Sequence, residues 1–150
     1  MSATRDIETI IRQLLGRQKF AVLATLREGV LFQNLVAFAA AEDLRKLCFA
    51  TGVYTRKYGN ISQNAQVALF VDDRRNSEGD FEHCLALTVR GTAGLPSSKE
   101  IAAWRRIYTT KHPYLDGFLD SPGSRLVEVS VQLYSLADSF QHVLEWQPPG

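Results

Sequence analysis

Cysteine and long apolar runs are both scarce in this sequence of 150 residues. No run approaches the roughly 18 consecutive apolar residues that span a membrane, and the first residues become amphipathic instead of forming a signal-peptide stretch. The two cysteines, Cys48 and Cys84, lie in apolar runs without CxxC spacing. These absences predict a cytoplasmic protein without a membrane segment, whose cysteines are small buried residues in a reducing compartment.

The sequence also has no excess of positive or negative charge. The chain has 17 basic and 16 acidic residues and a formal net charge of +1, so no long-range field favours nucleic acid or an anionic membrane as a partner. The pairs Arg74-Arg75 and Arg105-Arg106 are isolated and have no aromatic platform for stacking bases. We therefore expect no nucleic-acid partner, and any anion-binding site must be local.

Motifs for several common chemistries are also absent. There is no GxGxxG, Walker loop or GxSxG elbow, so a Rossmann nucleotide site and serine hydrolysis have no support. The histidines His83, His112 and His142 lie far apart without HExxH spacing, which favours structural roles. The acidic residues between Asp72 and Asp80 lack the EF-hand order of ligands, which favours a solvated loop. No metal site is expected.

Among the patterns that are present, two segments have the spacing of amphipathic helices. Over residues 4–16, apolar side chains recur at i, i+3, i+4, i+7 and i+8. The second helix follows a capping box formed by Ser97 and Glu100, and it should end before Pro113. A shorter helix is expected over residues 55–64, directly after a strand.

Strand patterns account for most of the remaining chain. Glu28-Gly29 is typical of a tight hairpin turn between two apolar strands.

The length of the chain is sufficient for one core that buries about two-thirds of the unfolded surface, so residues 1–150 are predicted to form one domain. The pattern predicts an α+β, mainly β fold, a six-stranded antiparallel barrel with flanking helices. The predicted strands are 20–26, 30–39, 46–51, 66–72, 83–95 and one that starts at 126.

The most informative stretch lies where the third strand ends and a short helix begins, because Thr55 is followed there by Arg56 and Lys57. Free N–H groups at a helix start, a hydroxyl, a guanidinium fork and an ammonium group together suit a phosphate. The same residues are also compatible with a threonine cap followed by solvated cations. Basic residues in a first turn oppose the helix dipole by roughly 0.3–1 kcal/mol each, which hints at a compensating anion.

The order of these elements resembles the pyridoxamine 5'-phosphate oxidase-like family of FMN-binding split β-barrels. A hairpin precedes a strand that ends in Phe-Ala-Thr, Thr-Arg-Lys opens a helix, and Asn64-Ala65-Gln66-Val67 leads into the next strand. The likeness runs from about Phe20 to Gly94, more weakly to Trp146, and is most specific over Leu47 to Val71. It implies FMN as cofactor and a homodimer with the flavin in the cleft between subunits.

The resemblance also implies which residues bind the cofactor. It places the flavin phosphate at the helix start, the ribityl chain beside the end of the third strand, and the isoalloxazine edge along the backbone of the second strand. The implied residues are Gln33, Asn34, Leu35, Val36, Ala50, Thr51, Thr55, Arg56 and Lys57. Additionally, His83 is a candidate to reach across the dimer, and Trp146 either packs the barrel end or covers the flavin.

The function that the resemblance implies is a flavin-dependent oxidoreductase acting on a small molecule, in which the cofactor supplies the redox chemistry. Catalytic residues and substrate stay unassigned. A non-catalytic flavin carrier or sensor, a relative that binds deazaflavin or haem, and an interaction domain with an empty cleft remain open. Pyridoxamine phosphate oxidation itself is not expected. The oxidase has a second-strand arginine where this chain has Gln33 and Asn34, and the segment 145–150 lacks its Arg-x-His substrate element.

Overall fold

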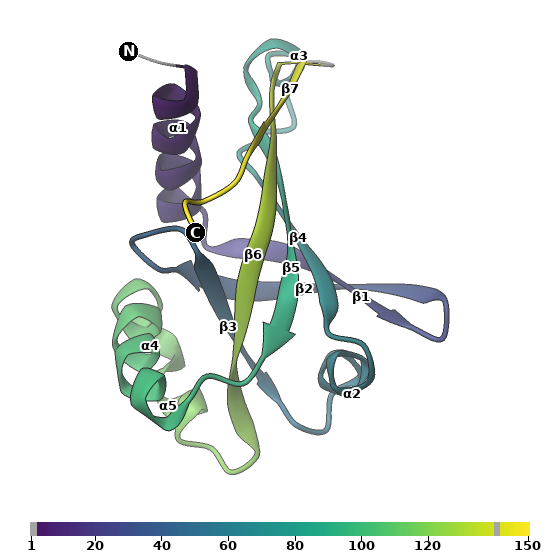
Figure 1. Cartoon of the computed structure of the whole chain (residues 1–150), viewed down its shortest axis with the longest axis vertical. Coiled ribbons are helices and arrows are strands. Elements are labelled where there is room, and N and C mark those ends of the chain that lie inside the picture. Colours follow the sequence, from purple (N-terminus) through teal and green to yellow (C-terminus); the bar gives the residue numbers. More distant parts are fainter. Residues whose placement is uncertain (1–2, 140–141) are drawn as a thin grey trace.

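The protein is described by a computed structural model that covers residues 3–139 and 142–150. Six antiparallel strands follow one another in the order β3-β2-β1-β4-β5-β6, and pairing of β3 with β6 closes them into a barrel (Figure 1). This confirms the predicted α+β, mainly β fold and its six-stranded antiparallel barrel. The strands are β1 (Phe20–Arg27), β2 (Val30–Ala40), β3 (Lys46–Gly52), β4 (Gln66–Asp72), β5 (Ala86–Gly94) and β6 (Ser124–Ser139).

A seventh strand, β7 (His142–Trp146), lies outside the barrel and pairs with the end of β6. β3 and β7 therefore share one edge of β6: β3 pairs with its first half, and β7 pairs with its last part. The Trp146 ring packs against Tyr134, with 5.8 Å between ring centroids. The sequence analysis did not predict β7, since five residues are too few for a clear alternation of burial.

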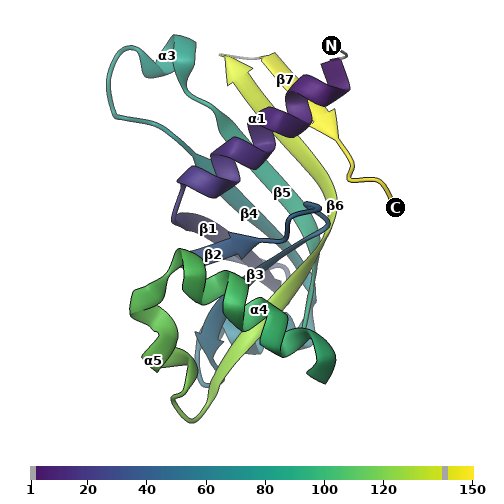
Figure 2. The ribbon, with the colours of Figure 1, turned by 90° about the vertical axis from the view of Figure 1, so that its left-hand side faces the viewer.

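Three helices cover the side of the barrel that faces the viewer in Figure 2. α1 crosses its upper part, and α4 and α5 cross its lower part. The predicted helices are confirmed, and the carboxylate of Glu100 accepts hydrogen bonds from both the N–H and the hydroxyl of Ser97 at the start of α4. The helices are α1 (Ala3–Arg17), α2 (Arg56–Gln63), α3 (Asp80–His83), α4 (Ser98–Lys111) and α5 (Asp116–Leu119), with a 3-10 turn at Pro113–Leu115.

One predicted boundary is wrong. β5 starts at Ala86, and the chain just before it forms the short helix α3 instead of continuing the strand from residue 83. The Asp80 carboxylate accepts backbone N–H bonds from Arg75, Asn76 and Ser77, which curls the acidic loop back on itself. This local side-chain to backbone bonding competes successfully with the extended conformation.

Side chains that alternate along the strands fill the barrel, among them Leu23, Phe49, Leu69 and Val129. A second, smaller cluster lies on the outer face of β2 and β3, where α4 contributes Trp104 and Tyr108. Within residues 3–139 and 142–150, none of the helices combines the length and apolar character needed to cross a bilayer.

The β1–β2 hairpin projects beyond the barrel (Figure 1). Glu28 and Gly29 form its turn with φ values of 51° and 78°. Both central residues have positive φ, as in the tight turns that match the twist of a hairpin. The predicted turn is confirmed, and it lets the two strands continue side by side to their ends.

Candidate cofactor-binding site

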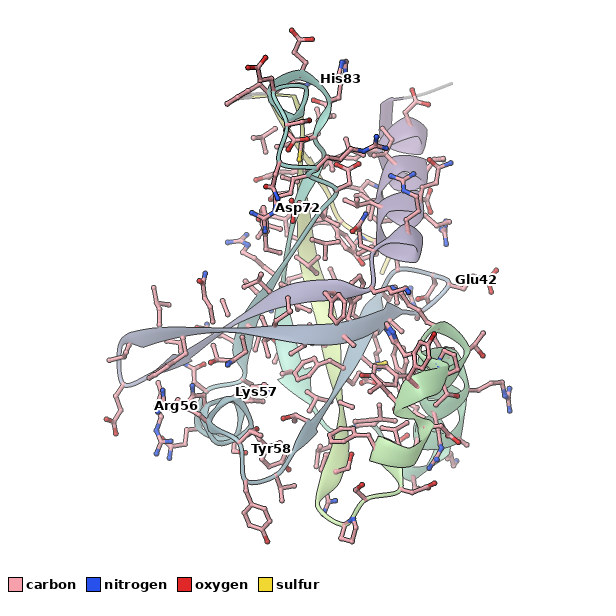
Figure 3. The ribbon with its side chains drawn as sticks, turned by 180° about the vertical axis from the view of Figure 1, so that it is seen from behind. Glu42, Arg56, Lys57, Tyr58, Asp72 and His83 are labelled. Carbon is pink, nitrogen blue, oxygen red and sulfur yellow. The ribbon has the colours of Figure 1, made fainter. Side chains whose placement is uncertain are left out.

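β2 and β3 separate after a short contact, and this separation creates the candidate site. The two strands pair only from Phe38–Phe49 to Ala40–Leu47. Over residues 30–37, β2 pairs with β1 on one edge, and no strand of the described chain pairs with its other edge. α2 lies beneath this part of the hairpin (Figure 3). An open strand edge and a helix start therefore lie in the same region.

Thr55 is the N-cap of α2, as the sequence predicts. Its Oγ1 accepts the N–H of Tyr58 at 3.3 Å, donates to the carbonyl of Gly52 at 2.9 Å and lies 2.8 Å from the Thr51 Oγ1. The backbone N–H groups of Arg56 and Lys57 have no acceptor in the part of the chain that the structure describes. Two orphan donors therefore point out of the first helical turn, where a helix has its positive end.

The two predicted cations sit on this turn without a carboxylate partner among the described residues. The Arg56 guanidinium lies over the ring of Phe32, with 5.2 Å between Cζ and the ring centroid. Arg56 is exposed and Lys57 is half-buried. Stacking on Phe32 restrains the arginine while its N–H groups remain available to an anion.

Two residues that the sequence analysis missed hold α2 against β1. Asn60 and Thr25 are both buried, and the Asn60 Nδ2 donates to the Thr25 Oγ1 at 3.0 Å. The Asn60 Oδ1 is also buried and has no partner in the described chain. The available signal was weak: Asn60 precedes Ile61, and these two are the buried residues of the helix. A buried amide is seldom placed without a polar partner.

The remaining predicted residues are distributed over two strands. On β2, Gln33 and Leu35 face outward, whereas Asn34 and Val36 face the same way as the interior residues of β1. Their side chains therefore point in opposite directions, and only their backbone groups share one edge. On β3, Thr51 is buried beside Thr55, but Ala50 faces the second cluster under α4 and α5. The structure thus brings Thr51, Thr55, Arg56 and Lys57 together and separates Ala50 from them.

The other candidates lie away from α2. His83 is on α3, at the opposite end of the molecule from Arg56 (Figure 3), and its side chain is 81% exposed. Trp146 is buried in the core, so packing is the interpretation that the structure supports. His112 is buried with its Nε2 2.7 Å from the carbonyl oxygen of Phe38, and burial lowers its pKa.

Cys48 is buried and Cys84 is partly buried, and both are free thiols. Burial raises the pKa of the Cys48 thiol to about 12, so this thiol stays protonated at neutral pH. The described residues contain no group of three or more His, Cys, Asp or Glu side chains placed to hold a metal ion.

Comparison with known families identifies the class to which this split barrel belongs. A model of the pyridoxamine 5'-phosphate oxidase family matches residues 7–135. The chain belongs to that family. The chain has no significant match among curated protein sequences.

Solved structures share the fold at low sequence identity. A haem-binding protein from Mycobacterium smegmatis superposes with a TM-score of 0.82 at 14% identity, over 91% of this chain and 56% of that one. The haem storage protein HutZ from Vibrio cholerae gives 0.72 at 15%, over 91% and 92%. A FAD-binding protein from Mesorhizobium loti gives 0.69 at 12%, over 91% and 94%. Identities this low establish the fold alone, and the chain spans little more than half of the mycobacterial protein.

Proposed function

We propose that this protein binds FMN and acts as a flavin-dependent oxidoreductase on a small molecule. The observation that carries the proposal is the first turn of α2, which lies beside an open strand edge. Within the described part of the chain, two of its N–H groups have no acceptor and its two cations have no carboxylate partner. Such a turn suits a phosphate monoester. Membership of the family, whose members include flavoproteins, supports the choice of a flavin phosphate.

The charges fit the group. A phosphate monoester carries about −1.5 to −2 charge at pH 7, and Arg56 with Lys57 supplies two positive charges. The Arg56 guanidinium can donate hydrogen bonds to two phosphate oxygens in a bidentate arrangement, while the Lys57 ammonium group adds a second positive charge. The Thr55 hydroxyl is engaged in capping, so its role in this proposal is to fix the first turn and thereby aim the two N–H groups.

The open edge of β2 would hold the ring system. No described strand pairs with the backbone groups of Gln33 to Val36 on that side, so they can bond a planar heterocycle in the way they would bond a neighbouring strand. A bound flavin supplies hydride and electron transfer. The chain's own contribution is binding, orientation and exclusion of water, and this explains why no catalytic constellation stands out in the sequence.

A homodimer would complete the site, and the outer face of the barrel supports it. Phe20, Val22, Leu35 and Phe70 line a shallow concavity on the outside of β1, β2 and β4. Phe20 is 56% exposed and Leu35 is 68% exposed. Large apolar side chains grouped on one exposed face mark an interaction surface, and this face adjoins the open edge of β2.

Haem is the second candidate, because two of the similar structures are described as haem-binding and haem storage proteins. A haem iron commonly takes a histidine ligand. Here His112 is buried against a carbonyl, and the exposed histidines His83 and His142 belong to α3 and β7, not to α2. This placement favours flavin over haem.

The absorption spectrum of the purified protein, with the mass of any ligand released by heat, tests the proposal. We expect the absorption spectrum of a bound flavin, about one FMN per chain, and reconstitution of stripped protein by FMN. Protein that neither carries nor takes up FMN would contradict the proposal. A Soret band would establish haem in its place. Reduction of the bound flavin by nicotinamide cofactors no faster than that of free flavin would indicate a carrier or sensor.

A further inference from the structure

Arg27, the last residue of β1, lies against α2 although it is remote from that helix in sequence. Thr25 and Arg27 are two residues apart on one strand and therefore face the same side. Thr25 bonds Asn60 of α2, and the Arg27 Nη1 lies 3.6 Å from the point that a Cβ atom on Gly59 would occupy. The two residues thus contact successive positions of the helix, and the buried Thr25–Asn60 bond fixes the distance between strand and helix.

This contact places Arg27 close to Arg56. Phe32 lies directly opposite Thr25 on the hairpin, and the Arg56 guanidinium covers its ring. Residues three apart on a helix are neighbours on one face, with roughly 5–6 Å between Cβ atoms, so the Gly59 position lies one turn from Arg56. Two guanidinium groups from different elements therefore flank the same turn of α2.

Among the described residues, no acidic side chain balances the charges on this turn. Arg27 has no ion pair or hydrogen bond to a described residue, and neither Arg56 nor Lys57 has a carboxylate partner. Other cations of the described chain are of both kinds, since Arg105 pairs with acidic side chains and the exposed Arg106 does not. What distinguishes the cations at α2 is that three of them lie around one helical turn. Neighbouring like charges repel, so an anion placed among three unpaired cations around one helical turn would be stabilised by all of them.

We infer that Arg27 is a third cation of the phosphate-binding site and closes it from the side of the β1–β2 hairpin. This inference rests on the proposed function, because it assigns a further binding residue to the same site. It also gives the projecting hairpin a role: the end of β1 carries a charged group to a ligand held by α2. The alternative is a purely structural role, in which the aliphatic part of the arginine side chain covers the surface of α2. The experiment must distinguish this role from phosphate binding.

The test compares FMN with riboflavin, which has the same ring and ribityl chain but no phosphate. Affinities for stripped wild-type protein, Arg27→Gln and the control Arg106→Gln are measured by quenching of flavin fluorescence, with thermal melts to verify folding. Arg106 is an exposed arginine on α4 without an acidic partner among the described residues. We expect Arg27→Gln to weaken FMN binding roughly 10–100-fold, as loss of a charge-assisted contact does, while riboflavin binding changes less than about threefold. Arg106→Gln should leave both affinities unchanged.

Three results would overturn the inference. If wild-type protein binds FMN and Arg27→Gln binds it equally well, Arg27 is not part of the site and the proposed function still stands. If Arg27→Gln loses FMN and riboflavin to the same extent, the arginine acts through structure and not through the phosphate. If wild-type protein binds no FMN, the proposed function fails together with the inference.

Discussion

At the scale of single residues, Lys111 shows how the fold changes the chemistry of a side chain. It ends α4 with its ammonium group half-buried, donating to the carbonyl oxygen of Leu15 at 2.7 Å and lying 3.8 Å from the centroid of the Phe38 ring. Burial lowers the pKa of Lys111 to about 8. The lysine therefore connects the end of α4 to the end of α1, and its ammonium group loses its proton near pH 8.

This shift predicts a pH dependence of stability. An unfolded lysine keeps its proton up to about pH 10.4, so between pH 8 and 9 the unfolded chain binds more protons at this position than the folded chain does. Stability must then rise with pH in this window. We expect the free energy of unfolding of wild-type protein, measured in urea, to increase from pH 7.5 to 9 relative to Lys111→Arg, which cannot titrate there. Parallel curves for the two proteins would contradict the assignment.

Residues of the candidate site differ in how well the sequence could predict them. Thr55, Arg56 and Lys57 are adjacent in the chain, so their cap and charge pattern was visible without coordinates, and the cap is confirmed. Arg27 and Asn60 belong to the site only because β1 packs on α2. No local pattern encodes that contact, which is why the sequence analysis did not single them out.

At the scale of elements, Gly91 determines how closely β5 approaches β6. The pairing register shifts between Arg90 and Gly91. A Cβ atom at Gly91 would lie 2.4 Å from the backbone oxygen of Ser130 and 2.8 Å from the Val129 Cγ1. Neither neighbour is the free end of a flexible chain, so any larger residue must push the two strands apart at the bulge.

We therefore expect Gly91→Ala to destabilise the fold by more than about 2 kcal/mol. Gly94→Ala is the matched control on the same strand, because nothing lies within 4 Å of its added Cβ. That change should be neutral or stabilising by up to about 1 kcal/mol. Chemical denaturation of both variants measures the difference, and equal stabilities would show that the bulge tolerates a side chain.

Elements were predictable where their pattern was long. The alternation in β6 and the helical spacing of α1 and α4 gave the right elements within a few residues. β7 is too short to be recognised, and the start of β5 was misplaced because the carboxylate of Asp80 captures three backbone N–H groups. Hydrophobic periodicity contains no information about such a local hydrogen-bonded turn.

At the scale of the whole molecule, the exposed apolar face of β1, β2 and β4 predicts association of two copies. Phe20→Asp places a charge on that face, and we expect the mass in solution to fall from about twice the chain mass of 16.8 kDa to a single chain mass. Leu95→Asp is the control, since Leu95 is 58% exposed against 56% for Phe20 and does not line that concavity. Light scattering after size exclusion measures both masses, and a dimeric Phe20→Asp protein would place the interface elsewhere.

The closure of the barrel and the family could be anticipated from the order of elements along the chain. The site could be anticipated only in part, because it forms where β2 and β3 separate and α2 packs under a projecting hairpin, and these are relations in space. Four statements remain predictions: that residues 1–150 form one domain, that the protein is cytoplasmic, that it binds FMN, and that it forms a dimer.

The affinity of FMN for wild-type protein and for Arg56→Ala/Lys57→Ala tests the central claim most directly. Lys99→Ala/Arg106→Ala removes the same two charge types from the exposed face of α4 and serves as the control. With the phosphate held at the start of α2, the first double variant should remain folded and bind FMN at least about 100-fold more weakly, while the control stays within about threefold of wild type. Unchanged FMN affinity in the folded Arg56→Ala/Lys57→Ala protein would contradict the account.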